Sequence, residues 1–175
     1  MEWRTIPAGQ LGNIKTLHDS VSAGDIPDGV GSYLVNDQVA ASLVELTRQK
    51  CKSALGMPDD MIPDPAGVGF CGYASAIVKK FMTLNGRAAN IVCVKIGGRE
   101  HFFVIASHRG SGYYFVVDLT SSQFTNGPQF VAADIYGIEK VAGTAEHGGE
   151  RLVDGYKMAL SSKGLKKAQK KGALW

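Results

Sequence analysis

Three closely spaced runs of β-branched and aromatic residues limit the folds open to this chain more than any other feature. They cover Ala89–Ile96, His101–Ser107 and Tyr113–Leu119, and each is rich in Val, Ile, Phe and Tyr. Such runs, separated by glycine-containing segments, predict β-strands. The second and third are joined by the short segment 108–112, which predicts an antiparallel hairpin. Both strands of the hairpin are apolar at successive positions, so we expect helices or strands on both faces of the sheet.

The residues before these strands predict two helices separated by a loop. Apolar residues recur at nearly helical spacing over Asn36–Leu55, and Asn36 or Asp37 is a suitable N-cap. Residues 56–70 are interrupted by prolines and glycines, which excludes a helix or a central strand. A second helix is predicted over Cys71–Leu84.

The two ends of the chain give weaker signals. Residues 1–33 contain several turn-forming pairs, and we expect a loosely structured arm packed on the domain. A further strand or helix is expected over 129–141 and a short helix over 150–160. Residues 163–175 form a basic tail with five clustered lysines, which predicts a solvated tail or helix face. Because no repeat or linker is present, residues 1–175 predict one domain of the α+β class.

Composition and charge argue against several classes of function. Hydrophobic residues make up 45% of the chain and charged residues 20%, as in ordinary globular proteins. The formal net charge of +3 is too small to indicate a nucleic-acid or membrane-surface protein. No segment approaches the roughly 18 to 20 apolar residues of a membrane span, and Met1–Thr5 do not begin a signal peptide. We expect no nucleic-acid or membrane partner, and a cytoplasmic location in the producing cell.

Three cysteines, Cys51, Cys71 and Cys93, raise the question of thiol chemistry. Their odd number and irregular spacing predict free thiols, and no Cys-x-x-Cys pair indicates zinc. We therefore expect neither a metal nor another cofactor. Cys51 falls on a predicted helix and Cys93 inside an apolar strand, so both are expected to be inert packing residues.

Cys71 differs from the other two because it opens a predicted helix after a glycine-rich loop. Unpaired N–H groups and the positive end of the helix dipole favour an anion at this point, which favours the thiolate of a cysteine. The same N–H groups can hold a developing oxyanion. A nucleophile is therefore one hypothesis, and a buried cysteine at a loop-to-helix junction is the other.

His101 and Asp118 stand at the start of one hairpin strand and at the end of the next. A tight turn centred between Arg109 and Gly110 makes them direct cross-strand neighbours on one face. A shift of the register by two residues would leave them diagonal on the same face. A shift by one would place them on opposite faces.

The chemistry of these residues suits their placement. A carboxylate that accepts a hydrogen bond from one imidazole nitrogen leaves the other nitrogen free to take a proton from a thiol. We predict a triad with Cys71 as the nucleophile, His101 as general base and acid, and Asp118 as the residue that orients the histidine. The alternative is that the His–Asp pair is a solvated rim at the ends of two strands.

Other polar residues are weaker candidates. Asp60 and Asp64 lie in the loop before Cys71, where they either border the site or only keep the loop soluble. Gln123 either donates a hydrogen bond near the site or caps a turn. The remaining histidines lie in the predicted hairpin turn or have no apparent partner.

Two segments resemble the papain-like cysteine protease superfamily. Gly69-Phe-Cys-Gly-Tyr-Ala74 resembles the Gly-x-Cys-Gly-x-x-Ala segment that carries the nucleophile, with one residue fewer before the alanine. His101-Phe-Phe-Val-Ile, followed by Tyr114-Phe-Val-Val-Asp-Leu-Thr120, resembles the His strand and the Asp-x-Thr strand of transglutaminase-like members. The close spacing of Cys71 and His101 is most similar to papain-fold toxin domains of bacterial polymorphic toxins. The resemblance covers about residues 65–125.

This resemblance implies a papain-like fold, in which the nucleophile helix packs on a small antiparallel sheet. It implies a thiol protease toxin or effector that hydrolyses a peptide bond in a target-cell protein. Such toxins reach the target cytoplasm through a specialised secretion system and are neutralised by an immunity protein. A glutamine deamidase or transglutaminase-like toxin with the same triad is the second hypothesis, and an inactive binding module is the third.

The chain departs from the papain pattern at one position. Papain-like proteases carry a glutamine six residues before the cysteine, where its side chain donates to the oxyanion. Pro65 stands at that position here, so the sequence leaves the second oxyanion donor unassigned.

Overall fold

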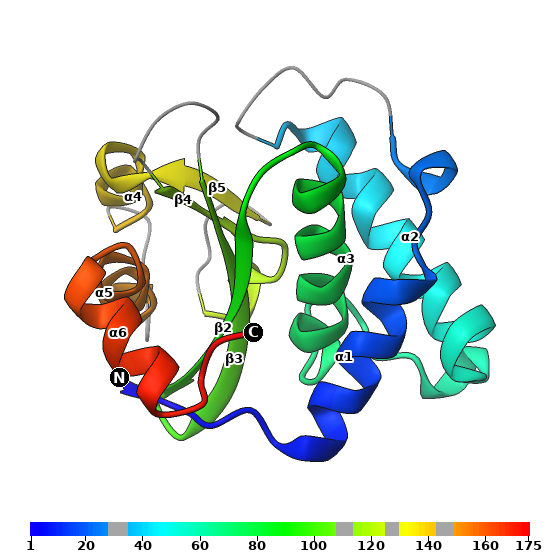
Figure 1. Ribbon diagram of the computed structural model, residues 1–175, viewed down its shortest axis with the longest axis horizontal. Coiled ribbons are helices and arrows are strands. Elements are labelled where there is room, and N and C mark those ends of the chain that lie inside the picture. The colour runs from blue at the N-terminus through cyan, green and yellow to red at the C-terminus, as the bar shows by residue number, and fades with distance from the viewer. Residues whose placement is uncertain (28–34, 108–113, 125–129, 143–148) are drawn as a thin grey trace.

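A five-stranded antiparallel sheet lies in the middle of the described part of the chain (Figure 1). The computed structural model describes residues 1–27, 35–107, 114–124, 130–142 and 149–175. The strands are adjacent in chain order: β1 (Glu2–Trp3), β2 (Ala89–Ile96), β3 (Arg99–Ser107), β4 (Tyr114–Asp118) and β5 (Val131–Asp134). The predicted hairpin is the β3–β4 pair. Its expected turn at 108–112 lies outside the described residues.

Helices cover both faces of the sheet, and each face buries its own apolar cluster. Figure 1 shows the two groups of helices on opposite sides of the strands. One group consists of α1 (Ala8–Ser20), α2 (Asp37–Leu55) and α3 (Phe70–Leu84). The other consists of α4 (Ile135–Ala142), α5 (Gly149–Ala159) and α6 (Ser162–Lys170). The α+β class and the coverage of both faces are as the sequence predicted.

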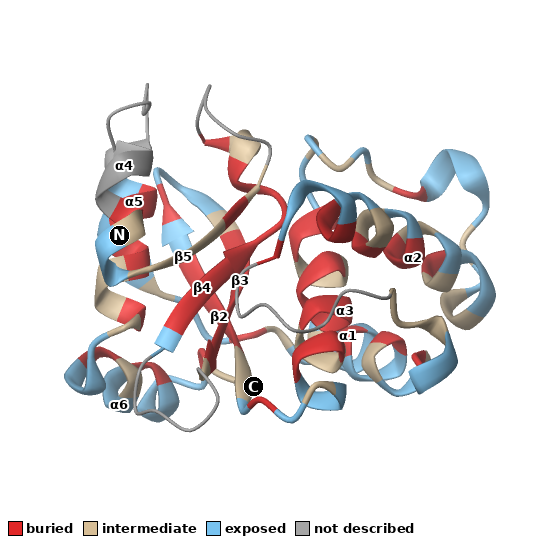
Figure 2. Ribbon diagram, turned by 90° about the horizontal axis from the view of Figure 1, so that it is seen from above, coloured by how far each residue is buried: buried red, intermediate tan, exposed pale blue. Residues whose placement is uncertain are grey.

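Helix α3 is the most deeply placed helix of the first group, packed between α1, α2 and strand β3. Figure 2 shows most of its length as buried, whereas α1 and α2 expose their outer sides. Its N-cap is Gly69, whose φ of 98° lies in the left-handed region that favours glycine. The helix begins at Phe70, so Cys71 lies in its first turn.

Helix α2 begins and ends as the sequence predicted. The side chain of Asn36 accepts a hydrogen bond from the backbone N–H of Val39 at 2.8 Å, which satisfies one of the unpaired donors of the first turn. Gly56 ends the helix in the left-handed conformation. The loop that follows is irregular except for the short 3-10 turn η2 (Asp59–Met61).

The N-terminal region differs from the loosely structured arm expected over residues 1–33. Residues 8–20 form the regular helix α1, and its inner residues Ile14 and Leu17 are buried in the core it shares with α3. Gly9 and Gly12 favour turns in this segment. In the structure, a Cβ atom added at either position would have no neighbouring atom within 4 Å. Packing of one apolar stripe therefore outweighs the low helix propensity of glycine. Residues 28–33 of the expected arm lie outside the described residues.

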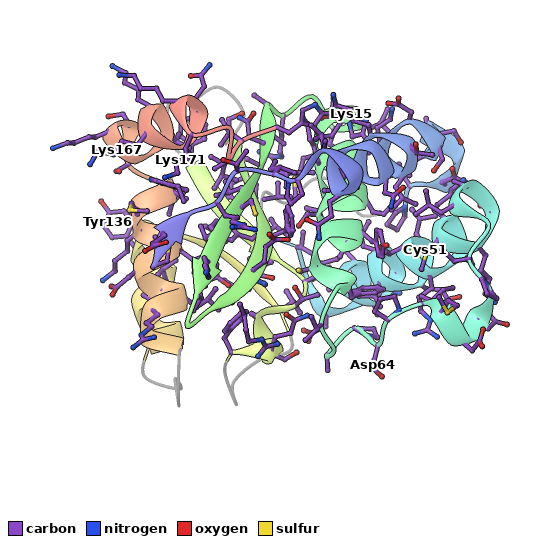
Figure 3. All side chains as sticks on the ribbon, turned by 90° about the horizontal axis from the view of Figure 1, so that it is seen from below. Lys15, Cys51, Asp64, Tyr136, Lys167 and Lys171 are labelled. Atoms are coloured by element: carbon purple, nitrogen blue, oxygen red, sulfur yellow. The ribbon has the colours of Figure 1, made fainter. Side chains whose placement is uncertain are left out.

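The C-terminal region is also more ordered than the predicted tail over 163–175. Its lysines are exposed on helix α6, as expected of a helix face, and Figure 3 shows Lys167 and Lys171 at the outer side of the molecule. Beyond the helix the backbone pairs with β2. Trp175 and Ile91 exchange two N–H···O hydrogen bonds of 2.6 and 3.0 Å. Because β1 pairs with the same strand, both ends of the chain cover the outer edge of the sheet.

The other expected elements are present. The segment 129–141 contains both a strand, β5, and most of helix α4, and the helix expected over 150–160 is α5. Within the described ranges, no helix has the length and apolar character needed to cross a membrane.

Candidate active site

Cys71 lies at the wall of a cleft of about 410 Å³ between helix α1, the loop before α3 and the β2–β3 hairpin. Only 4% of its surface is exposed. Polar side chains around the cleft come from α1 and the hairpin, namely Gln10, Arg99 and Glu100. This cleft offers a reagent or substrate a route to the sulfur.

His101 is fully buried on strand β3 and forms a short hydrogen bond with Asp118. The distance between His101 Nε2 and Asp118 Oδ2 is 2.6 Å. The other ring nitrogen, Nδ1, makes no regular hydrogen bond within the described part of the chain. The thiol of Cys71 lies near enough to the ring to help raise the pKa of the imidazole. His101 therefore bonds directly to the carboxylate of Asp118, whereas the thiol of Cys71 acts on the ring through its electrostatic effect.

The charge of Asp118 sets the proton affinity of His101. Burial alone would lower the pKa of the imidazole, but the carboxylate and its hydrogen bond, together with Cys71, raise the pKa of His101 to about 10. The ring therefore carries its proton at neutral pH. This favours a state in which the imidazolium faces the sulfur.

The register of the β3–β4 pair corrects one detail of the sequence prediction. Val104 faces Val117 and Ser107 faces Tyr114, so the pairing is shifted by two residues from the predicted one. His101 and Asp118 are consequently not direct neighbours. They lie diagonally on the same face, where the long imidazole side chain reaches the carboxylate.

Asp118 accepts hydrogen bonds at both of its oxygens. Oδ1 accepts from the backbone N–H of Thr120 at 2.9 Å and from its hydroxyl at 3.2 Å. Oδ2 accepts from His101 and from the hydroxyl of Tyr156, each at 2.6 Å. Burial alone would raise the pKa of Asp118, but the charge of His101 and these hydrogen bonds hold the pKa of the carboxyl below its ordinary value.

Tyr156 is a residue of this site that the sequence analysis missed. It lies on helix α5 and is fully buried, and its phenol donates to Asp118 from a position 38 residues away along the chain. Burial, together with the nearby carboxylate, raises its pKa well above the usual value, so the hydroxyl keeps its proton. One signal could have pointed to it. A tyrosine in an apolar helical stripe with Leu152 and Ala159 needs a buried partner for its hydroxyl.

The site joins groups from both sides of the sheet. Tyr156 belongs to the apolar cluster beneath α5, together with Phe103 and Val116 of the strands. Side chains alternate along a strand, so His101 and Asp118 point to that same side. Cys71 instead belongs to the cluster beneath α1 and α3. Strand β4 stops at Asp118, whereas β2 and β3 stay paired past His101 as far as Ile96 and Arg99.

Aromatic residues pack against the imidazole. The ring of Phe124 meets that of His101 edge-on, with centroids 4.8 Å apart, and Phe103 lies at 6.2 Å. The guanidinium of Arg99 lies over Phe124, with its central carbon 5.1 Å from the ring centroid. This packing keeps water from the His–Asp hydrogen bond.

Gln123 forms the hydrogen bond near the site that the sequence left as one of two alternatives. It belongs to the 3-10 turn η3 (Ser121–Gln123), and its Nε2 donates to the backbone oxygen of Gly67 at 2.5 Å. The turn that follows Asp118 is thereby tied to the loop that precedes Cys71. The two halves of the proposed triad are linked through this contact.

The acidic residues of the loop do not border the Cys71 cleft. Asp64 accepts a hydrogen bond from the N–H of Ala66 and lines a separate cleft of about 690 Å³, beside helix α2. Pro65 lines that same cleft, and Figure 3 shows Asp64 at the edge of the molecule. Asp60 lies exposed in the turn η2.

Cys51 and Cys93 occupy positions unlike that of Cys71, although all three cysteines are free. Cys51 is buried on α2 and Cys93 is buried on β2. Burial raises the pKa of the Cys51 thiol to about 11 and raises that of Cys93 further. Both thiols stay protonated at neutral pH, as expected of packing residues. Within the residues that the structure describes, no cluster of three potential metal ligands is present.

Comparison of the chain with protein-family models, with curated protein sequences and with solved structures found no match.

Proposed function

We propose that this chain is a cysteine-dependent amide hydrolase with Cys71, His101 and Asp118 as its triad. The observation that carries the proposal is the position of His101. The imidazole is fully buried and bonded to Asp118 at 2.6 Å, and the nearby Cys71 thiol contributes to its raised pKa. Buried histidines whose pKa is shifted by a specific charged partner are concentrated at functional sites.

The mechanism follows from these placements. The thiolate of Cys71 attacks an amide carbonyl, and the N–H groups of the first turn of α3 hold the oxyanion that forms. His101 then gives its proton to the leaving amine as the C–N bond breaks, which leaves a thioester on the sulfur. Water hydrolyses the thioester while His101 takes up its proton, and the free carboxylic acid and the starting enzyme result.

The substrate we favour is a peptide bond in a protein of a target cell. The Gly-x-Cys-Gly segment at Cys71 resembles that of papain-like proteases, and the short spacing to His101 resembles that of papain-fold toxin domains. On this proposal the chain is a toxin or effector delivered by a specialised secretion system. The producing cell would then need an immunity protein that blocks the Cys71 cleft.

A second candidate reaction is deamidation or transamidation of a glutamine side chain. The observation that favours it is the narrow access to Cys71, which is 4% exposed in its cleft. A single extended side chain enters such a cleft more readily than a polypeptide backbone does. The bonding of Asp118 by Thr120 also fits the Asp-x-Thr segment of transglutaminase-like members.

Two measurements test the proposal. In the first, iodoacetamide is added to the folded protein at neutral pH, and the alkylation of each cysteine is followed by mass spectrometry. We expect Cys71 to react much faster than Cys51 and Cys93, which serve as internal controls. Equal and slow reaction of all three would favour an inactive binding module.

In the second measurement, a target-cell lysate is incubated with the protein and with its Cys71→Ala variant, and its peptides are compared by mass spectrometry. New protein termini that depend on Cys71 identify a protease. Conversion of glutamine to glutamate without new termini identifies a deamidase. The Cys93→Ala variant is the matched control, because it removes a thiol that the mechanism does not use.

A further inference from the structure

The hydroxyl of Tyr156 makes a contact that packing alone does not require. Its ring already packs edge-on against Phe103, with centroids 5.0 Å apart. The oxygen is directed at Oδ2 of Asp118, the same carboxylate oxygen that accepts from His101, and both contacts measure 2.6 Å. A phenylalanine would fill the same space and leave this oxygen with a single donor.

A carboxylate in this position needs such a donor. Asp118 is 1% exposed and His101 is fully buried, so neither is stabilised by bulk water. An ionised carboxylate is retained in an apolar interior only when charged and hydrogen-bonding partners surround it. Thr120 supplies two donors to Oδ1, and among the described residues His101 and Tyr156 are the donors at Oδ2.

The geometry also fixes the direction of the carboxylate. Thr120 is two residues from Asp118 and holds one oxygen from the same turn of the chain. Tyr156 holds the other oxygen from helix α5, on a separate layer of the molecule. Two anchors on opposite oxygens prevent rotation of the group about its last bond. The remaining lone pair then points to the imidazole of His101.

We propose that Tyr156 is a positioning residue of the active site, which keeps the buried Asp118 ionised and aimed at His101. This inference rests on the proposed function, since the orientation of His101 matters only if the imidazole serves Cys71. The assignment makes helix α5 part of the catalytic apparatus. It acts through Asp118 and His101, and Tyr156 itself touches neither the thiol nor the substrate.

The test is a histidine titration that requires no substrate. The protein is labelled with ¹³C at histidine, and the ring signals of His101 are followed by NMR as the pH is lowered. Ionisation of Asp118 appears as an inflection in these signals. Tyr156→Phe keeps the ring and removes the donor, so we expect the inflection to move to higher pH by about one unit. In the same variant, alkylation of Cys71 should be slower at mildly acidic pH.

Thr47→Val is the matched control for the loss of a buried hydroxyl. Thr47 is fully buried on α2, and its hydroxyl bonds only within its own helix, to the backbone oxygen of Leu43 at 2.7 Å. This variant should lose stability without any change in the His101 titration. If the Phe variant does not fold, 3-fluorotyrosine at position 156 keeps the ring and strengthens the donor. The inflection is then expected at lower pH.

The possible outcomes distinguish the role of Tyr156 from the proposed hydrolase activity. An unchanged inflection in Tyr156→Phe, with only a loss of stability, would overturn the role of Tyr156 and leave the triad untouched. A shifted inflection, combined with slow alkylation of Cys71 in the unmodified protein, would support the role of Tyr156 toward Asp118. That combination would reject the hydrolase itself.

Discussion

The two faces of the central sheet are built for different purposes. The face beneath α1, α2 and α3 is almost wholly apolar, and a buried hydroxyl there, that of Thr47, is satisfied inside its own helix. The face beneath α5 encloses an ionisable network of His101, Asp118 and Tyr156. The first face mainly stabilises the fold, whereas the second also holds charge away from water, which is costly unless every partner is in place.

The nucleophile and its base come from opposite faces. Cys71 is carried by the N-terminus of α3 on the apolar side, and His101 points to the polar side. Strand β4 ends at Asp118, and its pairing with β3 does not extend to His101. Substitutions on the apolar side should therefore affect stability alone, except for those at Cys71, which should also affect reactivity. Changes on the polar side should affect both stability and reactivity.

The largest expected effect is the loss of the nucleophile. Cys71→Ala should lower kcat/KM by at least about 10⁴-fold, because thioester formation is no longer available. Cys93→Ala, on the apolar side of β2, should keep full activity and lose about 1 kcal/mol of stability. Steady-state kinetics and chemical denaturation of the two variants check this contrast. Activity that survives in Cys71→Ala would end the proposed mechanism.

The next effect concerns charge burial on the polar face. His101→Ala should lower the free energy of unfolding by about 3–5 kcal/mol, because the carboxylate of Asp118 then lacks its cation. Ile77→Ala, in the apolar core on α3, should cost a similar 2–5 kcal/mol by leaving a cavity. Adding Asp118→Ala to each variant separates the two causes. The added substitution should recover part of the stability lost in His101→Ala, because no unpaired carboxylate is then buried. It should recover none of the stability lost in Ile77→Ala.

The pH dependence of stability should differ between the two faces. The pKa of His101 is raised from 6.5 to about 10 in the fold, so its contribution is full below pH 6.5 and is lost as the pH rises toward 10. The pKa of Asp118 is lowered from 3.8, so its contribution is lost as the pH falls below that value. The pair should stabilise the fold most between about pH 4 and 6.5.

His18, on the opposite face, provides the contrast. Burial lowers its pKa from 6.5, so it should cost stability as the pH falls below that value. Urea denaturation at pH 5, 7 and 9 measures both effects. In the His101→Ala variant, the free energy of unfolding should no longer decrease toward pH 9. In the His18→Ala variant, it should decrease less as the pH falls toward 5. Parallel curves for all three proteins would show that neither histidine controls stability.

The sequence predicted the parts of the fold that local pattern determines. Runs of β-branched and aromatic residues located the strands, and Asn36 marked the start of α2. A hairpin turn centred between Arg109 and Gly110 predicted that His101 and Asp118 share a face. The exact pairing was not accessible, because it depends on the connection over residues 108–113. A shift of the pairing by two residues keeps His101 and Asp118 on the same face of the sheet and changes only which residue lies opposite each of them.

Contacts between distant segments account for what the sequence could not predict. Helix α1 forms because Ile14 and Leu17 pack on α3, and no local signal outweighed the glycines of that segment. Tyr156 joins the site only because α5 crosses the far face of the sheet at Asp118. A local sequence pattern contains no information on such a contact between distant segments.

The smallest expected effect tests the link between the two halves of the site. Gln123→Ala removes the hydrogen bond to the backbone of Gly67, which joins the turn after Asp118 to the loop before Cys71. We expect a loss of about 1 kcal/mol in stability and a decrease in kcat of up to about 10-fold, with KM nearly constant. Gln123→Glu is the matched variant, since it keeps the size of the side chain but cannot donate in its ionised form. If both variants retain full activity, Cys71 and His101 are aligned by α3 and β3 alone, and the loop is not part of the catalytic geometry.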